Sequence, residues 1–326
     1  MISNEKNAAV QQERANPRPR LWAAKHASDL EAITWRNIRR SWQAYLLLLP
    51  IFALLIVFVY YPPVLGLFRA FYEWRPGKEP IYIGLQNFQT YFADPDTPLE
   101  IVNMAKLLYW GLLASVVVPF IMAELIFAIR SASSKELYRF LVVIPMLVPG
   151  VVFTLLWRHL YDPALGPINK LLEITGLGFL ERNWLGDPAT ALYAIIFVGF
   201  PWVATTNTLI YLGGLAQISD SVFDACLLDG CTGLNRILRI DIPLVLGQVR
   251  LLTILAGINA LTSFNSVLIL TRGGPGYSTY VPGYRMYERA FIYGQFGYGS
   301  AIGLMLFVLA LLLTLIITKA IRPVSE

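Results

Sequence analysis

Six stretches of the chain are long, apolar and almost free of charge. Their approximate limits are 44–61, 107–129, 140–157, 191–212, 251–270 and 301–317. A helix that crosses the hydrocarbon layer needs about 20 mostly apolar residues, because it rises about 1.5 Å per residue. The pattern therefore predicts an all-α integral membrane protein with six transmembrane helices. We expect Pro62 and Pro63 to end the first of them.

Composition and charge support a membrane protein with both termini in the cytoplasm. Of 326 residues, 56% are hydrophobic and only 14% are charged. The net charge of +5 comes from Lys and Arg in the chain ends and short connections, which favours membrane orientation over nucleic-acid binding. We predict a basic, partly disordered cytoplasmic tail at 1–43, a membrane domain at 44–322 and a short tail at 323–326. The acidic connection at 62–104 should face outward.

Motifs for catalysis or metal binding do not occur in the sequence. Its one Gly-Lys pair, at Gly77 and Lys78, is followed by Glu79 and so is not a phosphate-binding loop. The chain also lacks a Gly-x-Ser-x-Gly nucleophile motif and a His-Glu-x-x-His metal motif. Cys226 and Cys231 are interpreted as small packing residues. We therefore expect no enzymatic activity, no metal site and no cofactor in this chain.

The connection at 213–248, expected on the cytoplasmic side, has an ordered pattern of small, acidic and apolar residues. Its distinctive positions are Asp224, Ala225, Cys226, Asp229, Gly230, Ile240, Ile242 and Pro243. A short helix with small side chains can approach a partner closely, glycine permits a turn, and proline redirects the chain. An amphipathic helix on the lipid surface is the alternative, but its several aspartates would be repelled by anionic headgroups.

This spacing resembles the coupling-loop motif of importer permeases in the ATP-binding-cassette (ABC) superfamily. That motif reads Glu-Ala-Ala, three residues, Gly, nine residues, Ile-x-Leu-Pro. Here Asp224 replaces Glu, Cys226 replaces the second Ala and Ile242 replaces Leu. These replacements keep the charge, the small size and the apolar character, so Cys226 is interpreted as a substitute for alanine.

Other segments resemble the larger permease of maltose-type sugar transporters. They are Gly84-Leu85-Gln86-Asn87-Phe88, Ile144-Pro145 with Val148-Pro149, Gly273-Gly274-Pro275, and Phe296-Gly297-Tyr298. The resemblance implies a multi-pass protein of the bacterial inner membrane that pairs with a second homologous permease. It also implies two ATPase subunits that bind ATP and Mg, and an extracytoplasmic binding protein that delivers a di- or oligosaccharide. Some members of the family carry glycerol phosphates instead.

Polar residues within the predicted spans are candidates for the substrate path, since polar side chains in a membrane usually face a partner or an aqueous cavity. They are Thr206, Asn207, Asn259, Thr262, Ser263, Asn265 and Ser266. Helical spacing places Asn259, Thr262, Ser263 and Ser266 on one face. Alternatively, such residues form hydrogen bonds between packed helices.

Two other functions would require residues that this sequence has few of. An ion-coupled secondary transporter should need ionisable residues inside the membrane, and only Glu124 is a serious candidate. We expect Glu124 to be a paired carboxylate near the interface. A membrane enzyme should carry acids and histidines near the span ends, where this sequence has few.

Overall fold

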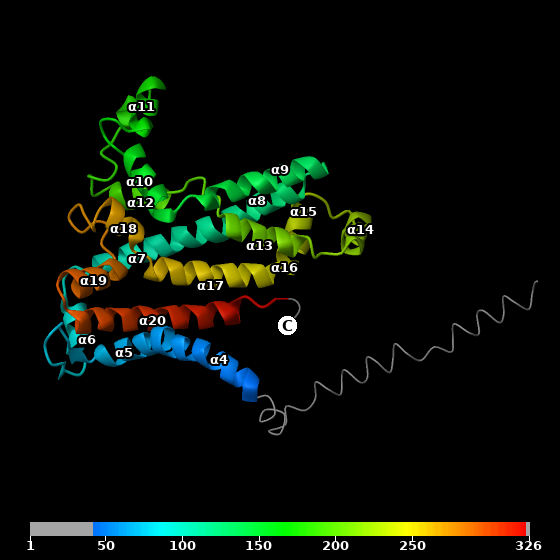
Figure 1. Cartoon of the computed structure of the whole chain (residues 1–326). Helices are drawn as coiled ribbons and strands as arrows, with labels where there is room; N and C mark the ends of the chain where they lie inside the picture. Colours follow the sequence, from blue (N-terminus) through cyan, green and yellow to red (C-terminus); the bar gives the residue numbers. More distant parts are fainter. Residues whose placement is uncertain (1–41, 324–326) are drawn as a thin grey trace, which may run out of the picture. The chain divides into compact units, whose positions relative to one another are not determined.

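The computed structural model describes residues 42–323 and is predominantly helical (Figure 1). The described residues divide into two units, with the boundary between Val64 and Leu65. The basic tail predicted at 1–43 lies almost wholly outside the described residues, as does most of the tail at 323–326.

The first membrane helix does not end at Pro62 and Pro63 as predicted. It consists of α4 (Trp42–Leu55), a π-helical turn (Ile56–Tyr60) and α5 (Tyr61–Arg69), and the apolar helix is continuous over Tyr45–Arg69. Tyr61 N donates a hydrogen bond to the carbonyl of Ile56 in the π turn. The two prolines, which have no N–H to donate, follow directly in the first turn of α5, where proline is tolerated.

Three more helices in the second unit are long and apolar enough to span a membrane. They are Thr97–Phe127, Leu246–Leu270 and Phe296–Ala320. The first comprises α7 (Thr97–Leu112), a π-helical turn (Leu113–Val117) and α8 (Val118–Phe127); the second comprises α17 (Leu246–Thr262) and α18 (Asn265–Leu270); the third is α20 (Phe296–Ala320). Helices are thus confirmed at four predicted spans, although the one at Thr97 begins about ten residues earlier than expected.

The other two predicted spans are not single straight helices. At the third, α9 (Ala132–Val143) and a 3₁₀ turn (Ile144–Leu147) meet α10 (Gly150–Leu160) at a bend of 87°. At the fourth, α12 (Ala191–Phe197) and α13 (Thr205–Leu215) are separated by residues 198–204, where Gly199 and Trp202 have positive φ angles. Among the described residues there are therefore four candidate spans, or five if the bent pair counts as one.

Short elements lie at the two ends of the second unit (Figure 1). The connection expected at 62–104 is partly helical. It contains the antiparallel pair β1 (Tyr72–Glu73) and β2 (Ile81–Tyr82), with Tyr72 opposite Tyr82, followed by α6 (Gln86–Ala93). The remaining elements are α11 (Pro167–Ile174), a 3₁₀ turn (Gly178–Leu180), α14 (Asp220–Leu228), α15 (Leu234–Arg236), a π turn (Ile237–Asp241), α16 (Ile242–Leu244), α19 (Pro282–Tyr287) and a π turn (Glu288–Ile292). Helices α14–α16 lie at the same end as the C-terminal end of α20, and α6 and α19 lie at the opposite end.

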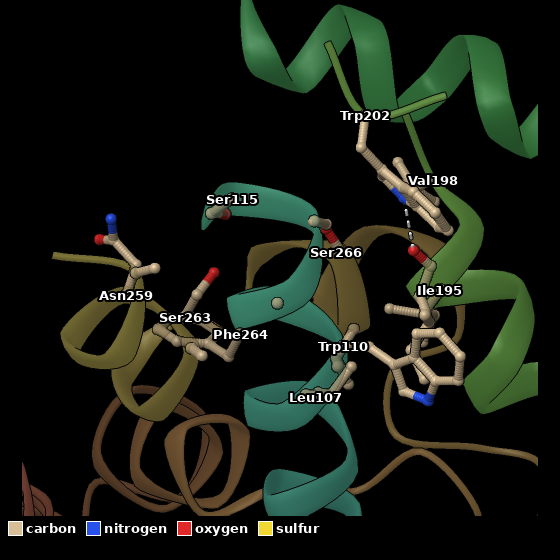
Figure 2. Close-up of a pocket in the computed structure, with 16 residues that line it drawn as sticks. Leu107, Trp110, Ser115, Ile195, Val198, Trp202, Asn259, Ser263, Phe264 and Ser266 are labelled. Carbon is tan, nitrogen blue, oxygen red and sulfur yellow. Dashed lines mark hydrogen bonds between the residues drawn. The ribbon is translucent and has the colours of Figure 1, made fainter. Parts of the chain in front are cut away.

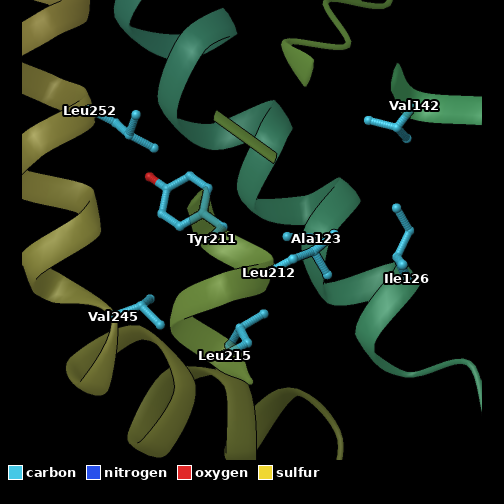
Figure 3. Packing of buried hydrophobic residues seen from close by; sticks show 8 residues of the cluster. All are labelled: Ala123, Ile126, Val142, Tyr211, Leu212, Leu215, Val245 and Leu252. Atoms are coloured by element: carbon cyan, nitrogen blue, oxygen red, sulfur yellow. The ribbon is translucent and has the colours of Figure 1, made fainter. Parts of the chain in front are cut away.

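A buried apolar cluster packs α8 against α13, the helix that precedes α14 in the chain (Figure 3). Ala123 and Ile126 of α8 pack with Tyr211, Leu212 and Leu215 of α13. The cluster is completed by Val142, Val245 and Leu252. Because side chains in such a core interlock, α8 and α13 should move as one body.

Candidate functional site

The segment between α13 and α17, residues 216–245, folds into a compact projection built around α14. Helix α14 ends at Leu228, and Gly230 follows with a φ of +70°. This left-handed conformation costs little for glycine and more for residues with a Cβ. No atom lies within 4 Å of a Cβ placed on Gly230, so the space beside it is open.

Cys226 contributes a hydrogen bond that closes this turn, in addition to its small size. Its thiol donates to the carbonyl oxygen of Cys231 at 2.8 Å, and the Cys231 N–H donates to the Cys226 carbonyl oxygen at the same distance. Both cysteines are free and buried. Burial raises the pKa of the Cys226 thiol to about 11, so the thiol stays protonated at neutral pH and is a poor nucleophile.

A buried ion network joins the projection to α8. Arg236 donates to a carboxylate oxygen of Asp241 at 2.9 Å and to one of Glu124 at 3.3 Å. Asp241 is fully buried, the Glu124 side chain is 7% exposed and the Arg236 side chain is 28% exposed. The guanidinium also lies over the rings of Phe223 and Phe127, at 5.5 and 5.9 Å. Glu124 is therefore a paired carboxylate, as predicted.

This network holds two carboxylates and one guanidinium. The second oxygens of both Glu124 and Asp241 are buried without a hydrogen-bond partner in the described structure. Burial raises the pKa of the Asp241 carboxyl above its ordinary value, although the Arg236 charge acts in the opposite direction. The arrangement depends on Arg236, because no other cation contacts these two carboxylates among the described residues.

The outer surface of the projection presents apolar side chains to the surroundings. Five leucines are exposed: Leu227 by 62%, Leu228 by 90%, Leu234 by 70%, Leu238 by 57% and Leu244 by 44%. Of the predicted positions, Asp224, Ala225, Asp229 and Gly230 are exposed, whereas Ile240, Ile242 and Pro243 are half-buried. Clustered exposed apolar residues mark surfaces that bind a partner or a membrane.

The helix bundle contains a cavity of about 320 Å³ (Figure 2). Its polar lining residues are Ser115, Asn259, Ser263 and Ser266. Its aromatic lining residues are Trp110, Trp202 and Phe264. In the described structure, Asn259, Ser263 and Ser266 have no side-chain hydrogen bond to the protein, so they are available to a ligand.

A second cavity of about 420 Å³ adjoins the first, and Ser115, Val198 and Trp202 line both. Trp202 has a φ of +57°, an unusual conformation for a bulky residue. Its indole N–H donates to the Ile196 carbonyl oxygen at 3.1 Å, which holds the ring in place. Such backbone outliers cluster at functional sites, because surrounding structure must enforce them.

The structure separates the predicted substrate-path residues into groups. Asn259, Ser263 and Ser266 line the first cavity, and Thr206 and Asn207 line the second. Thr262 and Asn265 line neither, because α17 ends at Thr262 and the chain bends before α18.

Asn207 also forms a hydrogen bond between packed helices, which is the alternative role expected for the polar residues in the spans. Its amide donates to the Ser115 carbonyl oxygen at 2.7 Å. Ser115 lies in the π-helical turn Leu113–Val117, and such a turn frees a backbone carbonyl from its usual partner. The amide therefore fixes α13 to this turn, and the carbonyl oxygen of Asn207 is left for a ligand.

Sequence reasoning missed three features of the site: Trp110, Ser115 and the role of Arg236. Trp110 and Ser115 lie in the predicted span 107–129, and a hydroxyl or indole group within a span is a signal for a substrate-path residue. Arg236 forms its ion pair with Glu124 across 112 positions of sequence, and the sequence contains no local signal for it.

An uncharged cavity inside a bundle of apolar helices, together with an exposed projection at one end, is typical of a membrane transport subunit. The sequence pattern of the family described as "Binding-protein-dependent transport system inner membrane component" matches residues 115–323. The chain belongs to this family, whose members are membrane permeases of ABC importers and not their catalytic subunits.

Individual relatives agree with this assignment. A probable ABC transporter permease of Pyrococcus horikoshii is 31% identical over 83% of this chain and 92% of its own length. The trehalose/maltose transport system permease MalF of Thermococcus litoralis is 29% identical over 87% of this chain and 95% of its own length.

Solved structures share the fold. One is a bacterial ABC transporter involved in import of the acidic polysaccharide alginate, with a TM-score of 0.78 and 24% identity, covering 90% of this chain and 99% of that chain. Another is a bacterial alginate ABC transporter in complex with an alginate pentasaccharide-bound periplasmic protein, also with a TM-score of 0.78 and 24% identity, covering 89% of this chain and 98% of that chain.

Proposed function

We propose that this chain is one of two homologous permease subunits of an importer that carries a di- or oligosaccharide across the bacterial inner membrane. The observation that carries the proposal is the projection at 216–245, which combines an exposed apolar surface with a buried ion network to α8. The name of the Thermococcus litoralis relative and the periplasmic protein in the alginate complex support a sugar delivered by a binding protein.

In this proposal the exposed leucines and the motif residues around Gly230 contact one of two cytoplasmic ATPase subunits. Those subunits bind ATP and Mg, and their closure displaces the projection. Because Arg236 ties the projection to α8, the helices that surround the two cavities move with it. The sugar enters from the binding protein, passes the cavities and leaves on the ATPase side. Both termini of the permease lie in the cytoplasm.

The test compares two glycines with similar positive φ angles. Gly230 has a φ of +70° and Gly176, which follows α11 at the other end, has a φ of +76°; a Cβ at either position meets open space. Gly230→Trp and Gly176→Trp therefore impose similar backbone strain, on the order of 1 kcal/mol. The assay measures ATPase subunits co-purified with each variant and the ATP-driven sugar uptake of reconstituted importers.

We expect Gly230→Trp to weaken binding of the ATPase subunit that this chain contacts and to lose most of the sugar uptake while the chain still inserts, and Gly176→Trp to keep its ATPase. Normal assembly and ATP-coupled transport in Gly230→Trp would contradict the coupling role. Uptake in vesicles that lack ATPase subunits, driven by an ion gradient, would instead favour the secondary transporter.

A further inference from the structure

The two cavities share one chemical property: their lining is polar and aromatic but uncharged. Within the described chain, no residue that lines either cavity is Asp, Glu, Lys, Arg or His. The polar groups are hydroxyls and amides, and the aromatic groups are Trp110, Trp202, Phe264 and Phe153. Hydroxyl groups of a sugar pair well with such amides and hydroxyls, and the C–H face of a sugar ring packs on aromatic rings.

The ionisable residues in the helix Thr97–Phe127, which contributes to both cavities, are engaged elsewhere. Glu100 pairs with Arg285, and Glu124 pairs with Arg236. The Lys106 ammonium lies 5.8 Å from the ring centre of Tyr193. The cavities themselves therefore offer no counter-ion to a bound anion.

This property distinguishes between substrate classes. An ionised carboxylate or phosphate that leaves water for a membrane-embedded cavity loses hydration worth several kcal/mol unless a cation pairs with it. A neutral saccharide needs only hydrogen-bond partners and apolar contact, which this lining provides. The volumes of about 320 and 420 Å³ lie at the lower end of the range of roughly 300–1,000 Å³ for small-molecule sites.

We infer that this permease carries uncharged saccharides and excludes acidic ones, including uronate oligosaccharides and glycerol phosphates. The inference rests on the proposed sugar-importer function. It also separates the chain from its structural neighbour, which is involved in import of an acidic polysaccharide. Trp110, Trp202, Asn259 and Ser263 are the residues assigned to this selection.

The first experiment measures binding and transport by the complete importer in nanodiscs and proteoliposomes. The neutral probes are maltotriose and cellotriose, and the acidic probes are trigalacturonate and glycerol 3-phosphate. Binding is followed by tryptophan fluorescence without the binding protein, so the two permease subunits and not the binding protein set the selectivity. We expect binding of neutral probes, and binding of acidic probes at least about 100-fold weaker.

The second experiment places a charge in the first cavity. Ser263→Lys should weaken neutral binding at least about tenfold and strengthen binding of trigalacturonate, with a salt-sensitive affinity. Ser133→Lys adds the same charge at an exposed position of α9, outside both cavities, and should leave both affinities unchanged.

The outcomes test three separate claims: the exclusion of acidic substrates, the assignment of the first cavity and the sugar function. Acidic probes that bind the unaltered importer as tightly as neutral ones would overturn the inference and would indicate that the second permease supplies cations. Identical selectivity in Ser263→Lys and in the unaltered importer would overturn the assignment of this cavity. If the importer neither bound nor transported either class, the sugar function itself would fall, and the inference with it.

Discussion

The ion network around Arg236 leads to a quantitative prediction, because the network holds one cation between two buried carboxylates. Arg236→Ala leaves Glu124 and Asp241 facing each other without a counter-ion. Removing one partner of a buried ion pair typically costs roughly 3–5 kcal/mol. The Arg236 side chain is 28% exposed, so water partly replaces it. We therefore expect a cost of about 2–3 kcal/mol, or about a 30- to 150-fold increase in local opening of residues 216–245.

Asp241→Asn provides the matched contrast. It leaves a balanced pair of Glu124 and Arg236 and weakens one charge-assisted hydrogen bond, because an amide oxygen can still accept from the guanidinium, so about 1 kcal/mol is expected. The double variant Arg236→Ala/Asp241→Asn should be less destabilised than Arg236→Ala alone, because one bare carboxylate is gone. This order of severity follows from charge balance and not from the number of contacts removed.

The assay is hydrogen exchange of the projection in the assembled importer, together with the ATP hydrolysed per sugar transported. Arg236→Ala should increase exchange across α14–α16 and raise ATP consumption per sugar, since the projection then moves without α8. Equal exchange in Arg236→Ala and Asp241→Asn would refute the charge-balance argument. An unchanged ATP-to-sugar ratio would refute the role of the network in transmission.

Three further predictions follow from the same structure. In Arg236→Ala, hydrogen-exchange protection corrected for intrinsic rates should increase as the pH falls toward the raised pKa of Asp241. A carboxyl whose pKa is higher in the folded state than in the unfolded state makes the folded state less stable at higher pH, where the carboxyl is charged. Gly297→Ala should lower thermal stability by about 1–3 kcal/mol, since its Cβ would overlap the Tyr72 carbonyl oxygen, whereas Gly303→Ala meets only a flexible methionine and should be nearly neutral in the same thermal melt. Tyr211→Phe should be neutral or stabilising by about 1 kcal/mol in that melt, because the Tyr211 hydroxyl is buried without a partner, and a loss above 2 kcal/mol would contradict this.

Sequence pattern alone predicted the helical membrane class and the helices at four spans. Those helices have long apolar runs, and hydrophobicity along the chain reports them directly. The pattern failed where backbone conformation decides the outcome. Pro62 and Pro63 stay inside a helix because a π turn precedes them, and the run at 191–212 is broken at residues 198–204 by Gly199 and Trp202. The pattern of hydrophobic residues predicts neither the π turn nor the break at 198–204.

The candidate site was predictable only in its local parts. The order of residues around Gly230 is a property of one short segment, so spacing could indicate it. The cavity depends on helices distant in sequence, and helical periodicity wrongly assumed that α17 continues through Ser263. Asn259 and Ser263, which were predicted as substrate-path residues, line the cavity, whereas Trp110 on another helix lines it but was not among the predicted residues.

In the proposed function, a displacement of the projection reaches the cavities through a series of contacts. Arg236 passes it to Glu124 on α8, and the apolar core locks α8 to α13 (Figure 3). Asn207 of α13 in turn holds the carbonyl of Ser115, which lines both cavities. The non-helical residues 198–204, which carry Trp202, join α12 to the moving α13. Because a non-helical connection deforms more easily than a helix, residues 198–204 are expected to take up most of the movement between α12 and α13, while the Trp202 indole stays bonded to Ile196 of α12.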